Sequence, residues 1–290
     1  MSLHVTMVQA CQRAGRGGSL TAVADETTLS DAERRAVPVR AGASHAAFVS
    51  LREDGVVALR FFTATGELPA CGHGTVAALA VLARRAGARQ YEAVLSSGGR
   101  TFLGQASGAG DRYRAAFDPG PVELGDPAWP DSEPVLAALG LDPREVEVRI
   151  ASVGRARMLV RVRDRRVLAE LAPDPARLRQ ACDRLGLLGC YVYSGPSTDG
   201  RAAARMFAPS IGVPEDIANA NSTACLAAVL AGQGAAGVEV DMGDTLGQPA
   251  TVTATSSPGP GGPAIRVGGI ATIVGASSGS RSHPGTLTEL

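Results

Sequence analysis

A thiol and an imidazole stand two positions apart at the start of a segment of small and apolar residues. In the sequence ACGHGT, Cys71 and His73 lie directly before the run VAALAVLA, which has the composition of a buried helix. The N-terminus of a helix carries unpaired N–H groups and the positive end of the helix dipole, so it suits a carboxylate ligand. A thiol and an imidazole placed there could transfer protons in a cleft. The residues beside them are candidates for binding a substrate: Gly72, Gly74 and Thr75.

The same arrangement returns in the second half of the chain. Residues 67–83 (ELPACGHGTVAALAVLA) and 215–231 (EDIANANSTACLAAVLA) match at seven of seventeen positions with a constant offset of 148. Each segment follows an Arg-x-Phe sequence, at residues 60–62 and 205–207. Alanine-rich composition accounts for part of the match, but an offset of about half the chain favours an internal duplication. We therefore expect two lobes, each with one buried central helix.

The two copies differ in the residues that could do chemistry. Asn219 and Asn221 occupy the positions of Cys71 and His73, so the second copy can form hydrogen bonds there but cannot exchange protons. If the two helix starts face each other, one small ligand would lie between a reactive wall and a binding wall. The simpler alternative is that both loops only begin a helix. Further candidates for binding in the second copy are Ser222 and Thr223.

Composition excludes several classes of enzyme and partner. The chain has 290 residues, and all 28 of its basic residues are arginine. Without lysine there can be no pyridoxal phosphate Schiff base, no lysine-dependent aldolase and no Walker A loop. The formal net charge of zero gives no basic surface for nucleic acid or an anionic membrane, so we expect neither as a partner.

The sequence predicts a cytoplasmic location and cysteines that are free thiols. The first residues, MSLHVTMVQACQRAG, do not have the pattern of a secretory signal. The longest apolar runs are too short to span a membrane, so we expect a cytoplasmic protein. The five cysteines have no paired CxxC spacing and are expected to be free thiols.

Apolar runs and turn residues predict the other elements and the domain boundaries. Residues 3–60 alternate short β-type runs with polar turns, and the proline-rich stretch 119–134 is interpreted as a connector without periodic structure. We therefore assign residues 1–120 to an N-terminal lobe, 121–280 to a C-terminal lobe and 281–290 to a flexible tail. The other expected elements are helices at 30–36, 134–139 and 174–185, strands at 146–152, 158–162 and 190–193, and a closing hairpin.

Five motifs, in this order, resemble those of the PhzF-like proteins, a phenazine-biosynthesis isomerase-like family in the diaminopimelate epimerase superfamily. The family's GNPAAV-type segment is matched by GSLTAV at residues 18–23, and its SETTFV-type segment by SHAAFV at 44–49. Its E-x-x-x-CGHAT segment is matched at 67–75, and its FxP…EDPxTGSA segment, with changes, at 207–222. A GGxAxxV-like strand follows at 268–274. The resemblance covers nearly the whole chain.

The resemblance implies a fold and a type of reaction. It implies an α+β protein of two pseudo-symmetric lobes, each a β-barrel-like sheet around a central helix, with the active site in the cleft between them. It also implies cofactor-independent proton transfer at carbon, in which an acidic residue of the SETTFV motif moves a proton within the substrate. The His of GHAT, here His73, and the Asp of EDPxTGSA, here Asp216, orient the ligand in the family. A homodimer is also implied, because family members are often dimeric.

The sequence departs from the family at the residue that moves the proton. His45 stands where the family has its catalytic glutamate, next to Ser44, and Ala220 and Asn221 replace the glycine and serine of TGSA. An imidazole has an ordinary pKa of about 6.5, so His45 is competent to move protons near neutral pH. The predicted catalytic residues are His45, Cys71, His73 and Asp216, and the predicted binding residues are Ser44, Gly72, Gly74, Thr75, Asn219, Asn221, Ser222 and Thr223.

Three other hypotheses were weighed against this one. Racemisation by two thiols needs one from each lobe, but Asn219 stands at the position opposite Cys71, and Cys225 falls inside the expected helix. Loss of the family's carboxylate could also leave a non-catalytic binding protein. A zinc site of Cys71, His73 and His45 would have an unusual C-x-H spacing, and we expect no metal and no other cofactor.

The leading hypothesis is a cofactor-free isomerase of a small unsaturated carboxylic acid in secondary metabolism, such as antibiotic biosynthesis. In it, His45 would remove and return the proton, while Cys71 and His73 would donate a second proton or hold an anionic group. Relatives in this family occur in pathways to alkylated proline units, so the resemblance suggests a cyclic substrate derived from an amino acid.

Overall fold

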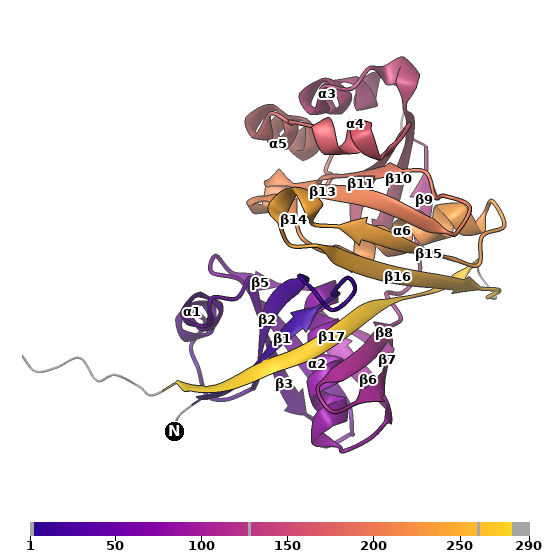
Figure 1. Ribbon diagram of the computed structural model, residues 1–290. Helices are drawn as coiled ribbons and strands as arrows, with labels where there is room; N and C mark the ends of the chain where they lie inside the picture. The colour runs from indigo at the N-terminus through magenta and orange to yellow at the C-terminus, as the bar shows by residue number, and fades with distance from the viewer. Residues whose placement is uncertain (1–2, 127–128, 260–261, 280–290) are drawn as a thin grey trace, which may run out of the picture.

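The computed structural model describes residues 3–126, 129–259 and 262–279, which form two lobes stacked on each other (Figure 1). The strands from β1 to β8, in indigo to magenta, form the lower lobe in this view, and the chain from β9 to β16 forms the upper one. The last strand, β17, returns to the lower lobe. Within the described ranges, no helix has both the length and the apolar character needed to cross a lipid bilayer.

The first lobe is a closed barrel of eight strands. The strands pair around the ring in the order β1, β2, β3, β4, β6, β7, β8 and β17, and β17 pairs with β1 to complete it. β5 (Glu67–Leu68) extends this sheet beside β4, and α1 (Asp31–Ala41) packs on the outside. The barrel strands are β1 (Leu3–Ala10), β2 (Ser19–Asp25), β3 (His45–Leu51), β4 (Val57–Phe62), β6 (Gln90–Ser97), β7 (Arg100–Ala109), β8 (Arg112–Phe117) and β17 (Ala264–Gly279).

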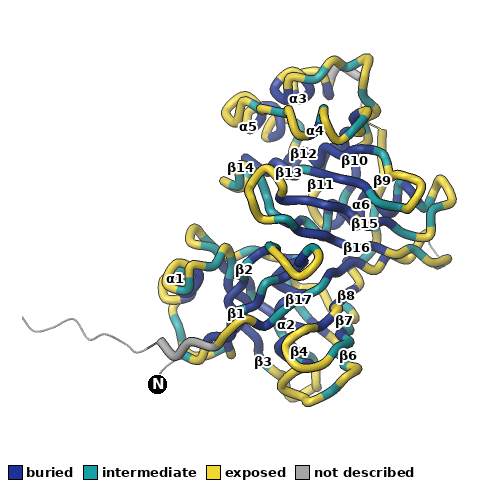
Figure 2. Tube along the Cα trace, viewed as in Figure 1, coloured by how far each residue is buried: buried dark blue, intermediate teal, exposed yellow. Residues whose placement is uncertain are grey.

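The central helix of this lobe, α2 (Gly72–Arg85), is buried because it is small and apolar on all sides. From His73 to Val81 every residue is buried, and only the last turn with its two arginines reaches the surface. The barrel strands approach the helix closely. At Gly104 on β7, a Cβ atom would collide with Leu79 of the helix, so the position needs glycine. Figure 2 shows the same burial, in dark blue, along the inner strands of both lobes.

The second lobe wraps one sheet around its own central helix, α6 (Ala220–Ala231). Its strands pair in the order β9, β10, β11, β12, β13, β15, β16 and β17, and β14 pairs with β13. Three helices cover the outer face of this sheet over a second hydrophobic cluster: α3 (Trp129–Leu139), α4 (Arg165–Glu170) and α5 (Pro175–Arg184). The strands are β9 (Glu123–Gly125), β10 (Glu147–Val153), β11 (Arg155–Val162), β12 (Cys190–Ser194), β13 (Arg201–Ala208), β14 (Val213–Asp216), β15 (Gly237–Met242) and β16 (Ala250–Ser257).

The predicted α+β fold, with a barrel-like sheet around a central helix in each lobe, is confirmed. The expected connector at 119–134 contains more structure than its prolines suggested, namely β9 and the first part of α3, so the helix predicted at 134–139 begins at Trp129. Proline is compatible with the first turn of a helix, because the N–H groups there have no partner within the helix. Three short 3₁₀ turns complete the chain: η1 (Pro143–Glu145), η2 (Pro209–Ile211) and η3 (Asp244–Leu246).

The last strand joins the two lobes. β17 pairs with β16 of the second lobe and with β8 and β1 of the first. It therefore belongs to the sheets of both lobes, although the sequence assigned it to residues 121–280 of the second. That residues 1–120 and 121–280 form two separate domains stays a prediction. The proposed tail at 281–290 lies outside the described residues.

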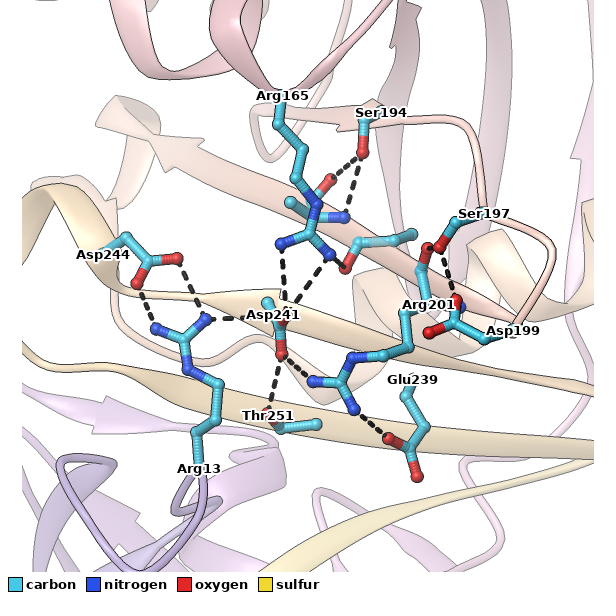
Figure 3. Close-up of polar contacts among 12 residues, drawn as sticks. Arg13, Arg165, Ser194, Ser197, Asp199, Arg201, Glu239, Asp241, Asp244 and Thr251 are labelled. Atoms are coloured by element: carbon cyan, nitrogen blue, oxygen red, sulfur yellow. Dashed lines mark hydrogen bonds and ion pairs between the residues drawn. The ribbon is translucent and has the colours of Figure 1, made fainter.

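Arginines from both lobes converge on one buried carboxylate, Asp241 of β15 (Figure 3). Arg201 donates to it at 2.6 Å and Arg165 at 3.3 Å, and Thr251 donates at 2.9 Å. Arg13, in the loop after β1, reaches across from the first lobe and lies 3.6 Å from the same carboxylate. A buried charge with several partners is costly to remove, because the partners are left without compensation. This network therefore ties the β1–β2 loop to the second lobe.

We expect Asp241→Asn to lower the free energy of unfolding by about 2–4 kcal/mol, because it leaves the surrounding guanidinium groups without their shared carboxylate. Urea titration followed by circular dichroism measures the change. Glu147→Gln is the matched control, since its ion pair with Arg161 is exposed and should contribute less than about 1 kcal/mol. Equal destabilisation by the two variants would contradict a structural role of the network.

Candidate active site

A cavity of about 570 Å³ lies between the lobes, at the N-terminal ends of α2 and α6. The two helix starts touch, because Gly72 leaves no room for a Cβ atom against Ala220. Both positive helix ends therefore face one enclosed space. Much of its wall is apolar, which favours burying most of a small ligand. The apolar lining residues include Phe61, Leu68, Phe102, Phe117, Leu188 and Ile217.

Three of the four predicted catalytic side chains form one hydrogen-bonded cluster. The Nε2 atom of His73 lies 2.9 Å from Nδ1 of His45 and 3.3 Å from Sγ of Cys71. The two imidazole rings meet edge to face with their centroids 4.3 Å apart. The cluster joins the start of α2 to the start of β3, so the barrel brings together residues that are 28 positions apart. All three side chains line the cavity.

The other lobe fixes the orientation of His73. Its Nδ1 atom lies 3.2 Å from the carbonyl oxygen of Ala218, which can only accept a hydrogen bond. Nδ1 must therefore carry a proton, and Nε2 is left to exchange protons with His45 and Cys71. His73 is buried, at 4% exposure, so it acts within the cluster rather than at the cavity surface alone.

The geometry of the α2 start explains why Cys71 faces this cluster. Cys71 is the N-cap residue, with extended backbone, and its side chain makes no capping hydrogen bond. The first hydrogen bonds of the helix come from Thr75, whose backbone N–H and hydroxyl both donate to the Cys71 carbonyl oxygen at 2.9 Å. Gly74 lies behind the thiol, where a Cβ atom would collide with Phe61. The thiol is therefore left free to contact His73.

The two rings together hold one proton beyond their neutral forms near neutral pH. Burial and the neighbouring His73 lower the pKa of His45 to about 2. Burial opposes a charge on His73 as well, but Cys71, by its charge and hydrogen bond, and Asp216 raise its pKa to about 9. Because the rings are hydrogen bonded, the shared proton belongs to the pair. The pair can thus act as an acid when charged and as a base when neutral.

His45 is the member of the pair that can pass this proton to a ligand. Its Nδ1 atom is occupied by His73 and by Ser44, whose Oγ lies 3.0 Å away. Ser44 is held in turn by Ser19, with the two hydroxyls 2.9 Å apart. Within the described part of the chain, Nε2 of His45 forms no hydrogen bond and is the remaining site for proton exchange.

The second lobe contributes hydrogen-bonding amides to the cavity together with the carboxylate of Asp216. Asn219 caps α6, with its Oδ1 atom accepting from the Ser222 N–H at 2.9 Å, and its Nδ2 atom donates to Asp216 at 2.9 Å. Asn221, in the first turn of α6, also lines the cavity. Asp216 is close enough to His73 to help raise its pKa, so the fourth predicted catalytic residue contributes charge to the cluster.

The structure brings most of the predicted site residues to the cavity but not all of them. Gly74, Ser222 and Thr223 lie behind its wall. Thr223 bonds to the Tyr191 hydroxyl at 2.8 Å, and Ser222 lies 3.3 Å from Arg157, so both are parts of the α6 support. The predicted residues that line the cavity are Ser44, His45, Cys71, Gly72, His73, Thr75, Asp216, Asn219 and Asn221.

Several polar residues that line the cavity were not predicted from the sequence, among them Ser19 and Arg157. Ser19 lies within the GSLTAV motif but carries no obvious chemistry of its own. Arg157 lies on the inward face of β11, two positions before the buried Leu159. Side chains two positions apart on a strand lie on the same face, so Arg157 and Leu159 share one face of β11. An arginine on the buried face of an expected strand is a signal of a buried charge.

The His45, Cys71 and His73 cluster is also a possible metal-binding set. The three ligand atoms lie within 4.8 Å of one another. Two nitrogens and one sulfur suit zinc with one position open to a ligand. The 2.9 Å between the two ring nitrogens equally suits a hydrogen bond. The distances therefore fit a proton-transfer group, and metal binding is the alternative to test.

Comparison with known protein families shows which family the chain resembles along most of its length. The model of the phenazine biosynthesis-like proteins matches residues 11–277 of the chain. The chain belongs to the phenazine biosynthesis-like protein family. The predictions of this family and of an isomerase are thereby confirmed, since the curated relatives are named as isomerases.

The relatives cover most of the chain at low identity. An uncharacterized isomerase of Deinococcus radiodurans is 29% identical over 279 residues, covering 89% of this chain and 88% of its own. The trans-2,3-dihydro-3-hydroxyanthranilate isomerase of Pseudomonas fluorescens is 26% identical over 248 residues, covering 82% and 84%. Among solved structures, a predicted epimerase of Pseudomonas aeruginosa superposes with a TM-score of 0.82 at 23% identity, covering 97% and 100% of the two chains. The similarity to this solved structure shows a shared fold.

We expect the ring of His73 to remain charged at pH 7.5 and to titrate with a pKa of about 9, because Cys71 and Asp216 stabilise its charge. Cys71→Ala removes the nearest of these groups and should lower that pKa toward the ordinary value of about 6.5. Nitrogen-15 NMR of the histidine rings across pH 5–10 measures both values. Cys225→Ala, which removes a thiol outside the cavity lining, is the control and should leave the pKa unchanged. An equal shift in both variants would contradict the contact between Cys71 and His73.

Proposed function

We propose that the protein is a cofactor-independent isomerase that moves a proton, and with it a double bond, within a small unsaturated carboxylic acid. The observation that supports this most directly is the His45–His73–Cys71 cluster at the cavity wall. An acid and a base held together at one wall can remove a proton from one carbon and return it to another. The cluster needs no other group for this step.

The protonation of the cluster supports these roles. Because the histidine pair carries one extra proton near neutral pH, Nε2 of His45 can donate to a substrate carbon. Cys71, whose Sγ lies 3.3 Å from Nε2 of His73, is the second side chain of the cluster that can exchange a proton with the substrate. After donation the pair is neutral and His45 can accept a proton again. His45 thus acts as a shuttle whose proton affinity comes from its bond to His73.

The opposite wall favours isomerisation over racemisation by two thiols. Racemisation needs a second proton-exchanging group on the other side of the reacting carbon. That position is held by Asn219, whose side chain is engaged with Asp216 and the α6 backbone. Cys225, the other thiol of this helix, is fully buried and is not part of the cavity lining. The amides are therefore assigned to substrate binding.

The substrate class follows from the cavity and from the relatives together. The space is largely apolar and ends at two helix N-termini, which suits a small cyclic acid with its carboxylate at the helix starts. One relative is named for an isomerisation of a dihydro-hydroxyanthranilate, an unsaturated cyclic amino acid. We propose a related substrate from secondary metabolism, such as an alkylated proline precursor in antibiotic biosynthesis. A cytoplasmic homodimer is part of the same proposal.

Proton NMR in heavy water, with a panel of unsaturated cyclic and acyclic amino acids, tests this function. We expect deuterium to enter one carbon as the double-bond signals move. His45→Gln and Cys71→Ala should each slow this exchange by about 10²- to 10⁴-fold, the usual loss when a general acid or base is removed. Cys225→Ala should retain the rate.

Other outcomes of this experiment assign the protein elsewhere. Exchange at the α-carbon that depends on Cys71, with loss of optical purity and no migration of the double bond, would indicate a racemase. Binding of a panel member without exchange, unaffected by His45→Gln, would indicate a binding protein.

The metal alternative is tested by removing metal from the same preparation. We expect dialysis against a chelator to leave the exchange rate unchanged, because the proposed steps use only side chains of the chain. Added zinc should inhibit, since His45, Cys71 and His73 would then serve as ligands. A rate that falls at least tenfold on chelation and returns with zinc would show that a metal, rather than the shared proton, drives the reaction.

A further inference from the structure

We propose that Arg157 makes the second-lobe wall of the cavity a subsite for the carboxylate group of the substrate. The inference rests on the proposed function only in taking the substrate to be an organic acid. The observations that support it concern the surroundings of Arg157. No motif of the sequence pointed to Arg157, and it belongs to neither the cluster of His45 nor the Asn219 cap. It lines the same cavity from β11, in the lobe opposite Cys71.

Arg157 is held by three hydrogen bonds, which leave two of its five N–H donors to spare. Its side chain is 1% exposed, and its Nη2 atom donates to the carbonyl oxygens of Val153 and Arg155 at 3.3 and 2.7 Å. Nη1 lies 3.3 Å from Oγ of Ser222 in the first turn of α6. Nε has no hydrogen-bond partner among the described residues. A buried donor without a partner is uncommon and costs free energy.

The charge of Arg157 lacks compensation. Within the described ranges no carboxylate forms an ion pair with it, whereas the buried Arg34 pairs with Glu26 and the half-buried Arg205 pairs with Glu215. The groups that act on its charge are Cys225, which favours it, and Arg155, which opposes it. A buried guanidinium normally requires an anion to offset its desolvation.

The position of the Arg157 guanidinium group further favours a bound anion. Ser222 is in the first turn of α6, so Arg157 places its charge beside the positive end of the helix dipole. Two positive features together would repel each other unless an anion lies between or beside them. Ala220 and Asn221, the residues that begin α6, line the same cavity as Arg157. A substrate carboxylate there would compensate both charges at once.

This placement also orients the substrate. A carboxylate held at the start of α6 directs the remainder of the molecule toward the first lobe, where Cys71 and His45 line the cavity. The carbon atoms next to the carboxylate would then face the proton-transfer cluster. Arg157 would act as a specificity-determining residue, because a neutral analogue of the substrate could not offset the buried charge.

The test compares a carboxylate with its neutral amide. Anthranilate and anthranilamide have the same ring and differ in charge at one group. We expect wild-type protein to bind anthranilate at least about tenfold more tightly, as expected for a charged hydrogen bond in a buried site. The backbone amide signals of Asn221 and Ser222, followed by NMR, report binding at this position. Arg157→Met should abolish the preference.

The controls separate a charge effect from a folding defect. Arg155→Met removes the same charge from the cavity mouth, where the side chain is exposed, and should keep the preference. Arg157→Lys retains the positive charge and should keep part of it, even if the turn between β10 and β11 is weakened. Wild-type protein that binds the two ligands equally, or neither, overturns the proposal, as does an unchanged preference in a folded Arg157→Met protein.

This result and the test of the proposed function are distinguishable. Loss of the carboxylate preference in Arg157→Met, in a protein that shows no deuterium exchange with any substrate, would support the subsite and reject the isomerase. Exchange that depends on His45, with a carboxylate preference unaffected by Arg157→Met, would support the isomerase and reject the subsite.

Discussion

The contact between the starts of the two central helices is the constraint on which the rest of the site depends. Gly72 and Ala220 meet without room for a larger side chain, so α2 and α6 point their N-termini into the same space. Only at this separation can His73, on one helix, reach the carbonyl oxygen of Ala218, just before the other. That single hydrogen bond fixes which ring nitrogen exchanges protons. The packing of the two helices therefore determines which ring nitrogen of His73 carries a proton.

The same arrangement explains the electrostatic character of the cavity. Two helix N-termini, the histidine pair and Arg157 all contribute positive charge. Cys71 and Asp216 offset part of it from within the cluster. The largely apolar lining strengthens the interaction of these charges with a ligand, because an apolar wall screens charge less than water does. The lobes are joined around this cavity through β17, which pairs with strands of both, and through the ion pairs of Asp241.

The fold could be predicted from the sequence further than the site. The internal repeat and the apolar segments identified both central helices, and nine of the twelve predicted site residues line the cavity. The sequence did not indicate that β17 serves both sheets, because strand partners far apart in the chain leave no local pattern. It did not separate Asn221, which faces the cavity, from Ser222 and Thr223, which support α6 from behind. These adjacent residues differ only by a rotation of about 100° each around the helix axis, and packing decides which of them faces the cavity.

The imidazole of His45, in place of the carboxylate that the family resemblance implies, changes the charge balance rather than only the base. A carboxylate beside His73 would itself supply the negative charge that holds the imidazolium. With His45 neutral, that charge must come from Cys71 and Asp216, which are the groups that raise the pKa of His73. The thiol thus becomes necessary to the proton affinity of the pair. The substitution can be functional in this chain because Cys71 lies 3.3 Å from His73, on the nitrogen that His45 shares.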